Sequence, residues 1–158
     1  MKIVVKGERF MKSFPRTLGA WLASGIGSYV LAALFSQFVV LMGLMGLGLE
    51  ISLLDNVSSM FHAVLHMVPY LVVILLGFAI AFGVARGVKK IVPNLAIIAY
   101  PVAGAAAIGA ALGLMYLRFG VFPILGAQET YGLLMQMAAG AVGGLIFERL
   151  RPKGMVAG

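Results

Sequence analysis

Long apolar stretches dominate this chain, and short segments rich in charge or turn-forming residues separate them. A helix that crosses a bilayer needs roughly 18 or more apolar residues without charge. Four stretches meet or approach that length, namely 17–49, 67–85, 91–117 and 130–147. The pattern therefore predicts an all-α integral membrane protein built as a bundle of four transmembrane helices.

Four spans account for most of the chain. We expect a basic amphipathic arm at 1–16, a transmembrane domain at 17–150 with spans near 17–46, 67–86, 91–118 and 130–149, and a basic tail at 151–158. The first apolar run far exceeds the roughly 7 to 15 residues of a signal-peptide core, so an uncleaved first span is expected. Little sequence remains for a soluble catalytic domain.

Positive charge is concentrated in three places. The chain has 12 Lys and Arg, 5 Asp and Glu, and a net charge of +7. All the cations except Arg118 lie in the arm, in the connection between the second and third spans, or in the tail. By the positive-inside rule, both termini should be cytoplasmic. This distribution predicts the lipid bilayer as partner and no nucleic acid, and the compact size and basic ends suggest a bacterial inner membrane.

The arm itself allows two interpretations. On a helical wheel its five cations occupy one third of the circumference, with apolar residues mostly opposite: Lys2, Lys6, Arg9, Lys12 and Arg16. Such a helix would lie on anionic lipid, each cation contributing about 1 kcal/mol near the surface. Gly7 and Pro15 weaken this interpretation, and the alternative is a floppy leader that serves only as a topology signal.

Small residues recur at helical spacing and predict close helix packing. The first span repeats them every four residues, at Ala20, Ser24, Ser28, Ala32 and Ser36. The fourth span carries two overlapping pairs, Ala139/Gly143 and Gly140/Gly144, which suit contact with the third span or with a second copy. The third span contains PVAGAAAIGAALG, so we expect other helices to enclose it.

The interiors of the four stretches contain no Asp, Glu, Lys, Arg or His. Ion-coupled carriers usually keep such a group within the bilayer, so their class is disfavoured. Neutral polar residues remain, chiefly Gln37 and Gln136 at similar depth. They could hydrogen-bond to each other as structural contacts. The alternative is that they line a solute path together with Ser24, Ser28 and Ser36.

The segment before the second span predicts a short amphipathic helix at the outer interface. With Asp55 as its N-cap, apolar residues recur at helical spacing, and Asp55, Ser59, His62 and His66 form a polar stripe opposite them. His62 and His66, four residues apart, could share a metal ion, and nearby methionines would suit Cu(I). A haem is a further alternative. A polar stripe that faces water is satisfied by that water and needs no ligand, so no cofactor is expected.

Familiar catalytic chemistry has no support in this sequence. Cysteine is absent, and no GxxxxGK[ST], HExxH or GxSxG motif occurs. We therefore expect a non-enzymatic membrane protein that acts through helix contacts, as an accessory or scaffold subunit of a complex or as a homo-oligomer. A small oligomeric transporter or channel for an uncharged solute or a lipid is the alternative, and copper or haem binding by the paired histidines is a second one.

Overall fold

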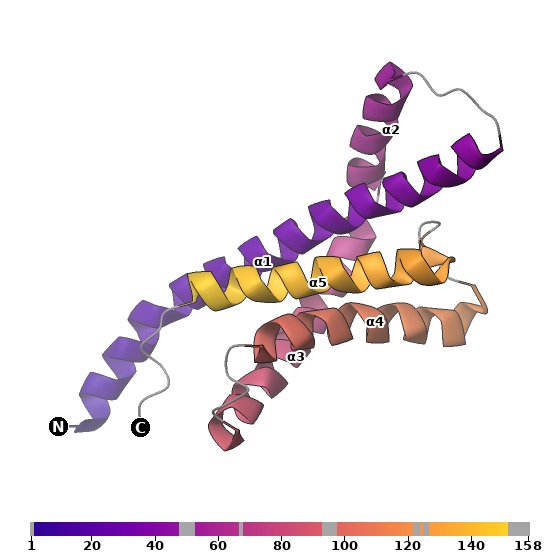
Figure 1. Cartoon of the computed structure of the whole chain (residues 1–158). Helices are drawn as coiled ribbons and strands as arrows, with labels where there is room; N and C mark the ends of the chain where they lie inside the picture. Colours follow the sequence, from indigo (N-terminus) through magenta and orange to yellow (C-terminus); the bar gives the residue numbers. More distant parts are fainter. Residues whose placement is uncertain are drawn as a thin grey trace.

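The computed structural model describes residues 2–47, 53–66, 68–92, 98–121, 124 and 127–151, without the side chains of residues 2–13, 53–56, 60, 63 and 66. Five helices make up almost all of this part of the chain (Figure 1). They are α1 (Lys2–Gly46), α2 (Leu53–His66), α3 (Val68–Ile91), α4 (Ala99–Phe119) and α5 (Thr130–Leu150). The predicted all-α class is confirmed for the described residues.

Four of the described helices are long and apolar enough to cross a membrane: Phe14–Gly46 within α1, and the whole of α3, α4 and α5. This confirms the predicted number of spans among the residues described and indicates a multi-pass membrane protein. Apolar segments of this length form helices in lipid because a helix satisfies its backbone hydrogen bonds within itself.

The helix boundaries differ from the predicted ones at the connection between the second and third spans. Helix α3 continues through Arg86 and Lys90 to Ile91, and α4 begins at Ala99, whereas the hydrophobic pattern placed these limits near 86 and 91. Hydropathy shows where the apolar side chains end, but the backbone hydrogen bonds of the helix continue into the charged segment. Pro93, two positions beyond α3, disfavours the helical conformation of the residue before it.

The basic arm is helical and continuous with the first span. Helix α1 begins at Lys2 and passes through Pro15 without a separate element between arm and span. In the sequence-based interpretation, Gly7 and Pro15 weakened a helical arm. One proline removes a single backbone hydrogen bond, so the helix on either side of it can persist.

The four long helices form a closed ring of neighbours. Helix α1 packs against α3 and α5, and α4 packs against the same two helices. Successive long helices run in opposite directions, so the start of α1 and the end of α5 lie at the same end of the bundle (Figure 1). We call this the basic end, because α3 also ends there with Lys89 and Lys90 in its last turn. Helix α2 contacts α1 and α3 at the opposite end.

Glycines bring the backbones of α4 and α5 into direct contact. A methyl group added to Gly104 would meet the carbonyl of Gly140, and one added to Gly144 would meet the carbonyl of Tyr100. On another face of α5, a methyl group on Gly143 would lie 2.7 Å from the ring of Phe78. Only a hydrogen atom fits at these positions, so the glycines set the separation of the helices.

The predicted enclosure of the third span is wrong for the single chain. One face of α4 is buried, at Tyr100, Gly104, Ile108 and Leu112. The opposite face is exposed and includes Val102, Ala106, Ala110 and Leu114. Small residues permit close helix contact all round, but among the described helices α4 packs mainly against α3 and α5, which leaves its opposite face uncovered.

We expect Gly104→Ala to destabilise the bundle by roughly 1–3 kcal/mol, because the added methyl group overpacks a backbone contact that cannot move like a side chain. Thermal unfolding in mild detergent measures this effect. Gly113→Ala is the matched control, since it lies in the same helix with open space around its Cα. Equal unfolding midpoints for the two variants would show that Gly104 does not set the helix separation.

Candidate functional site

The small-residue ridge of α1 is buried along its length, at Ala20, Ser24, Ser28, Ala32 and Ser36. The hydroxyl of Ser28 donates to the carbonyl oxygen of Ala139 in α5 at 2.9 Å. The hydroxyl of Ser24 donates to the carbonyl oxygen of Trp21 within α1 at 2.7 Å. In α5, Ala139 and Gly143 therefore face α1, while Gly140 and Gly144 face α4. These serines are engaged in helix packing.

Gln136 is fully buried and links three helices. Its Nε2 atom donates to the carbonyl oxygen of Ala32 in α1 at 2.9 Å, and its Oε1 atom accepts from the hydroxyl of Tyr70 in α3 at 3.2 Å. Burying an amide requires such partners, since an unpaired polar group inside a bundle is unfavourable. The side chain thus joins α5 to α1 and α3 toward the end of the bundle opposite the basic end.

Gln37 has a different partner from the one predicted. Its Nε2 atom donates to the carbonyl oxygen of Ser59 in α2 at 2.7 Å. The hydroxyl of Tyr29 also donates to α2, at the carbonyl oxygen of Val64. These bonds attach α2 to α1, and they replace the expected bond between Gln37 and Gln136 because Gln37 lies toward α2 while Gln136 points into the bundle.

The histidine pair lies partly outside the described residues. His62 is exposed on α2, and its Nδ1 atom lies 2.9 Å from the carbonyl oxygen of Ser58. A carbonyl accepts only, so Nδ1 carries the proton and Nε2 faces away from this bond. The side chains of His66 and Asp55 are not described, and the described residues contain no group of three metal-ligating acidic or histidine side chains. Metal binding there stays a prediction.

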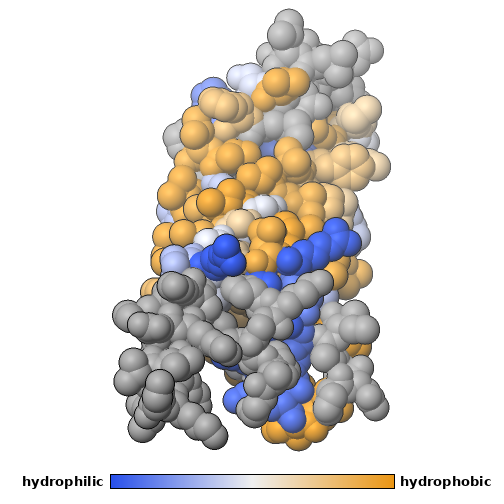
Figure 2. Space-filling view, turned by 90° about the vertical axis from the view of Figure 1, so that its left-hand side faces the viewer, coloured by the Kyte–Doolittle hydropathy of each residue, from blue (hydrophilic) through white to orange (hydrophobic). Residues whose placement is uncertain are grey.

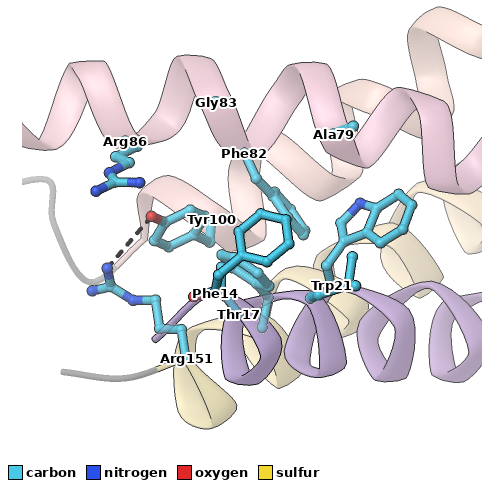
Figure 3. Close-up of a pocket in the computed structure, with 11 residues that line it drawn as sticks. Phe14, Thr17, Trp21, Ala79, Phe82, Gly83, Arg86, Tyr100 and Arg151 are labelled. Carbon is cyan, nitrogen blue, oxygen red and sulfur yellow. Dashed lines mark hydrogen bonds between the residues drawn. The ribbon is translucent and has the colours of Figure 1, made fainter. Parts of the chain in front are cut away.

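A cavity of about 450 Å³ lies at the basic end between α1 and α3 (Figure 3). Helices α4 and α5 close it from behind. We call it the basic-end pocket, lined by Phe14, Thr17, Leu18, Trp21, Ala79, Phe82, Gly83, Arg86, Tyr100, Phe147 and Arg151. Its volume falls within the roughly 300–1,000 Å³ of small-molecule sites, and mostly apolar walls with a few polar groups are typical of them.

Aromatic rings from three helices form the wall of this pocket. The ring centroids of Phe82 and Phe147 lie 4.5 Å apart, and Tyr100 meets Phe147 edge-on at 5.0 Å and Phe82 at 5.5 Å. Each ring is buried. Stacked and edge-on aromatic pairs such as these add roughly 0.5–1.5 kcal/mol beyond their burial. The cluster therefore holds α3, α4 and α5 together at the wall of the pocket.

A charged network lies behind Tyr100. Lys89, whose side chain is 3% exposed, places its Nζ atom 2.6 Å from Oε2 of Glu148. Arg151 places Nη2 2.9 Å from Oε1 of the same carboxylate and donates from Nη1 to the Tyr100 hydroxyl at 3.4 Å. The Lys89 ammonium also lies 4.2 Å from the centroid of the Tyr100 ring, within the range of a cation–π contact.

Sequence reasoning missed this network. Lys89 counted only as a topology signal in a connection, and Glu148 was assigned no role. One signal was available in the sequence: Glu148 lies directly before Arg149, close to Arg151. The positive-inside rule accounts for the cations of this segment but not for an acidic residue among them. Nothing in the sequence specified that α3 would continue far enough to bring Lys89 against α5.

The basic-end pocket offers hydrogen-bond donors beside apolar walls. Arg86 and Arg151 contribute guanidinium groups, and Trp21 contributes an indole N–H. The buried Nε1 atom of Trp21 and the buried Nε atom of Arg151 have no hydrogen-bond partner among the described residues. Such a set can bind and orient an acceptor-rich molecule. Comparisons with protein-family models, curated proteins and solved structures found no match to this chain.

We expect Glu148→Ala to destabilise the bundle by roughly 3 kcal/mol and so to lower the unfolding midpoint by roughly 6–12 °C, because it leaves the buried ammonium of Lys89 without its counter-charge. Thermal unfolding in mild detergent measures the change. The matched control is Glu129→Ala, which removes an exposed carboxylate before α5 at the opposite end and should have little effect.

The double variant Lys89→Met/Glu148→Ala shows whether Glu148→Ala loses stability because Lys89 is left unpaired or because packing around position 148 is disturbed. It should recover much of the lost stability, because an apolar side chain replaces the stranded cation. If the double variant unfolds at or below the temperature of Glu148→Ala, the ion pair is not the source of the effect.

Proposed function

We propose that this chain is a non-enzymatic, multi-pass membrane protein that acts through helix–helix contacts between copies of itself. The observation that carries the proposal is a lateral groove between α3 and α4, with a cavity of about 880 Å³ and an almost wholly apolar lining. The exposed face of α4 is part of it. A second copy of this chain is the occupant that the shape of the groove favours.

The two sides of the groove differ in side-chain size. In its middle, helix α4 supplies mainly small residues, with larger ones beside and beyond them at Val102, Leu114 and Met115; the small residues are Ala99, Ala103, Ala106, Ala107, Ala110 and Ala111. Helix α3 supplies an exposed ridge of large residues every four positions, namely Leu76, Ile80, Val84 and Val88. A ridge of this spacing follows one row of a helix surface and fits the shallow surface that alanines leave on a partner helix.

This arrangement is self-complementary. A two-fold axis along the membrane normal would place the α3 ridge of one copy on the α4 alanines of its partner, and the reverse contact would follow by symmetry. Small residues let helix backbones approach closely, which favours helix association over contact with lipid chains. The proposed unit is therefore a symmetric dimer, with further copies or other subunits as extensions of it.

The distribution of charge supports a cytoplasmic location of both termini, and the membrane that we propose is a bacterial inner membrane. Figure 2 shows the face that lies to the left in Figure 1, where α1 begins and α5 ends; its hydrophilic residues gather in the lower half, below a hydrophobic surface. Arg86, Lys90 and Arg149 belong to this end of the bundle, while Arg118 and Glu129 flank the connection at the other end. The described helices thus support the positive-inside orientation.

Polar contacts inside the bundle favour this proposal over a solute path. Gln136 bonds to Ala32 and Tyr70, and Ser28 bonds to the backbone of α5. A path along these groups would have to break the bonds that join the helices.

The oligomeric state tests the proposal. Native mass spectrometry and cross-linking in nanodiscs should give a dimer for the wild-type chain and a monomer for Ala106→Phe, because the large ring would block the small-residue side of the groove. Ala138→Phe is the matched control, since it changes an exposed alanine of α5 outside the groove and should remain dimeric.

A wild-type monomer in both measurements would overturn the dimer. A wild-type complex with a different membrane protein, disrupted by Ala106→Phe and kept by Ala138→Phe, would instead assign the groove to a partner subunit.

A further inference from the structure

The basic-end pocket contains donors that the described part of the chain leaves unsatisfied. The indole Nε1 of Trp21 and the guanidinium Nε of Arg151 are buried without a hydrogen-bond partner there. Buried donors in folded proteins nearly always have an acceptor from the protein, from water or from a ligand. Both residues line the same cavity, so a bound molecule with acceptor oxygens could serve both.

The charge of the pocket selects an anion. The guanidinium groups of Arg86 and Arg151 lie on either side of the Tyr100 hydroxyl (Figure 3). The nearby carboxylate of Glu148 already pairs with both Lys89 and Arg151. Among the described side chains, one carboxylate beside three cations leaves excess positive charge. Planar guanidinium groups bind phosphate oxygens with paired hydrogen bonds.

The pocket is polar at one end and apolar along the rest. Arg86 and Arg151 lie at one end in Figure 3, Trp21 lies at the other, and the rings of Phe14 and Phe82 lie between them. A ligand that matches this order has an anionic head, an apolar body and a further acceptor oxygen near Trp21. Inorganic phosphate or a soluble dianion would satisfy only the first of these features.

The pocket opens to the side of the bundle, where lipid lies in a membrane. Ala79 and Gly83 of α3 and Leu18 of α1 are all exposed at its edge. A ligand can therefore enter between α1 and α3 without leaving the bilayer. Its location at the basic end places the two guanidinium groups at the level of phosphate headgroups if this end meets the membrane surface.

We propose that the basic-end pocket binds one anionic phospholipid. The phosphate group lies between Arg86 and Arg151, an ester carbonyl accepts from the indole N–H of Trp21, and the start of an acyl chain lies against Phe14 and Phe82. The site is independent of the proposed dimer, because it lies between α1 and α3 and the groove lies between α3 and α4.

Trp21 is the single tryptophan of the chain, so its fluorescence reports on this pocket alone. Purified protein is titrated in neutral detergent with phosphatidylglycerol brominated near the ester end of its acyl chains, and separately with phosphatidylcholine brominated at the same positions. Bromine quenches tryptophan on contact. We expect quenching to saturate at a concentration of phosphatidylglycerol about tenfold lower than that of phosphatidylcholine. Equal quenching curves for the two lipids would overturn the proposal.

Arg86→Gln tests the role of the headgroup contact. Loss of one charge-assisted contact should weaken binding of brominated phosphatidylglycerol by about tenfold. Arg149→Gln is the matched control, because it removes the same charge from the same end at an exposed position outside the pocket. Equal weakening by both variants would show that general surface charge, not the pocket, attracts the lipid.

Gly83→Leu tests the cavity without changing charge. Gly83 lines the pocket and has open space around its Cα, so a leucine should fill the opening and abolish the selective quenching. Gly87→Leu lies one turn away on α3, also in open space and outside the lining, and should quench like the wild type. Unchanged quenching in Gly83→Leu would overturn the site.

Displacement of the lipid by millimolar inorganic phosphate alone would assign the pocket to a soluble anion and overturn the proposal that it binds a lipid.

Discussion

The backbone contact between α4 and α5 is the constraint on which the rest of the bundle depends. Gly104, Gly140 and Gly144 leave room for carbonyl groups of the facing helix, so the two backbones meet without intervening side chains. Apolar side chains meet an apolar environment whether the helices are separate in lipid or packed together. The hydrophobic effect therefore does not drive their association, and close packing has to supply the stability. With α5 fixed against α4, its other face presents Ala139 and Gly143 to α1.

Polar groups then join the helices at two levels. Gln136 bonds to α1 and α3 inside the bundle, and Glu148 bonds to Lys89 and Arg151 at the basic end. Both sets are buried or partly buried, where hydrogen bonds are stronger and unpaired groups are more costly. The basic-end pocket lies beside the second set, so the residues that hold α3 on α5 also leave positive charge at the polar end of the pocket.

The sequence predicted the features that depend on local pattern. Length and hydropathy predicted the four spans, and four-residue spacing grouped the small residues from Ala20 to Ser36 on one face of α1, which is buried in the bundle. The pattern could not specify which helices would meet. It therefore paired Gln37 with Gln136, although Gln37 bonds to α2, and it expected α4 to be enclosed.

By itself, the sequence determined that this chain consists of apolar helices with basic segments at their ends, because a backbone in lipid must satisfy its own hydrogen bonds and charge must stay near water. Only the tertiary structure decided that Lys89, Tyr100, Glu148 and Arg151 form one network and that Trp21 shares a cavity with two arginines. Apart from Glu148 and Arg151, which lie three positions apart at the end of α5, these residues belong to different helices. Their meeting depends on helix length, rotation and contact distance, which no local pattern of hydrophobicity encodes.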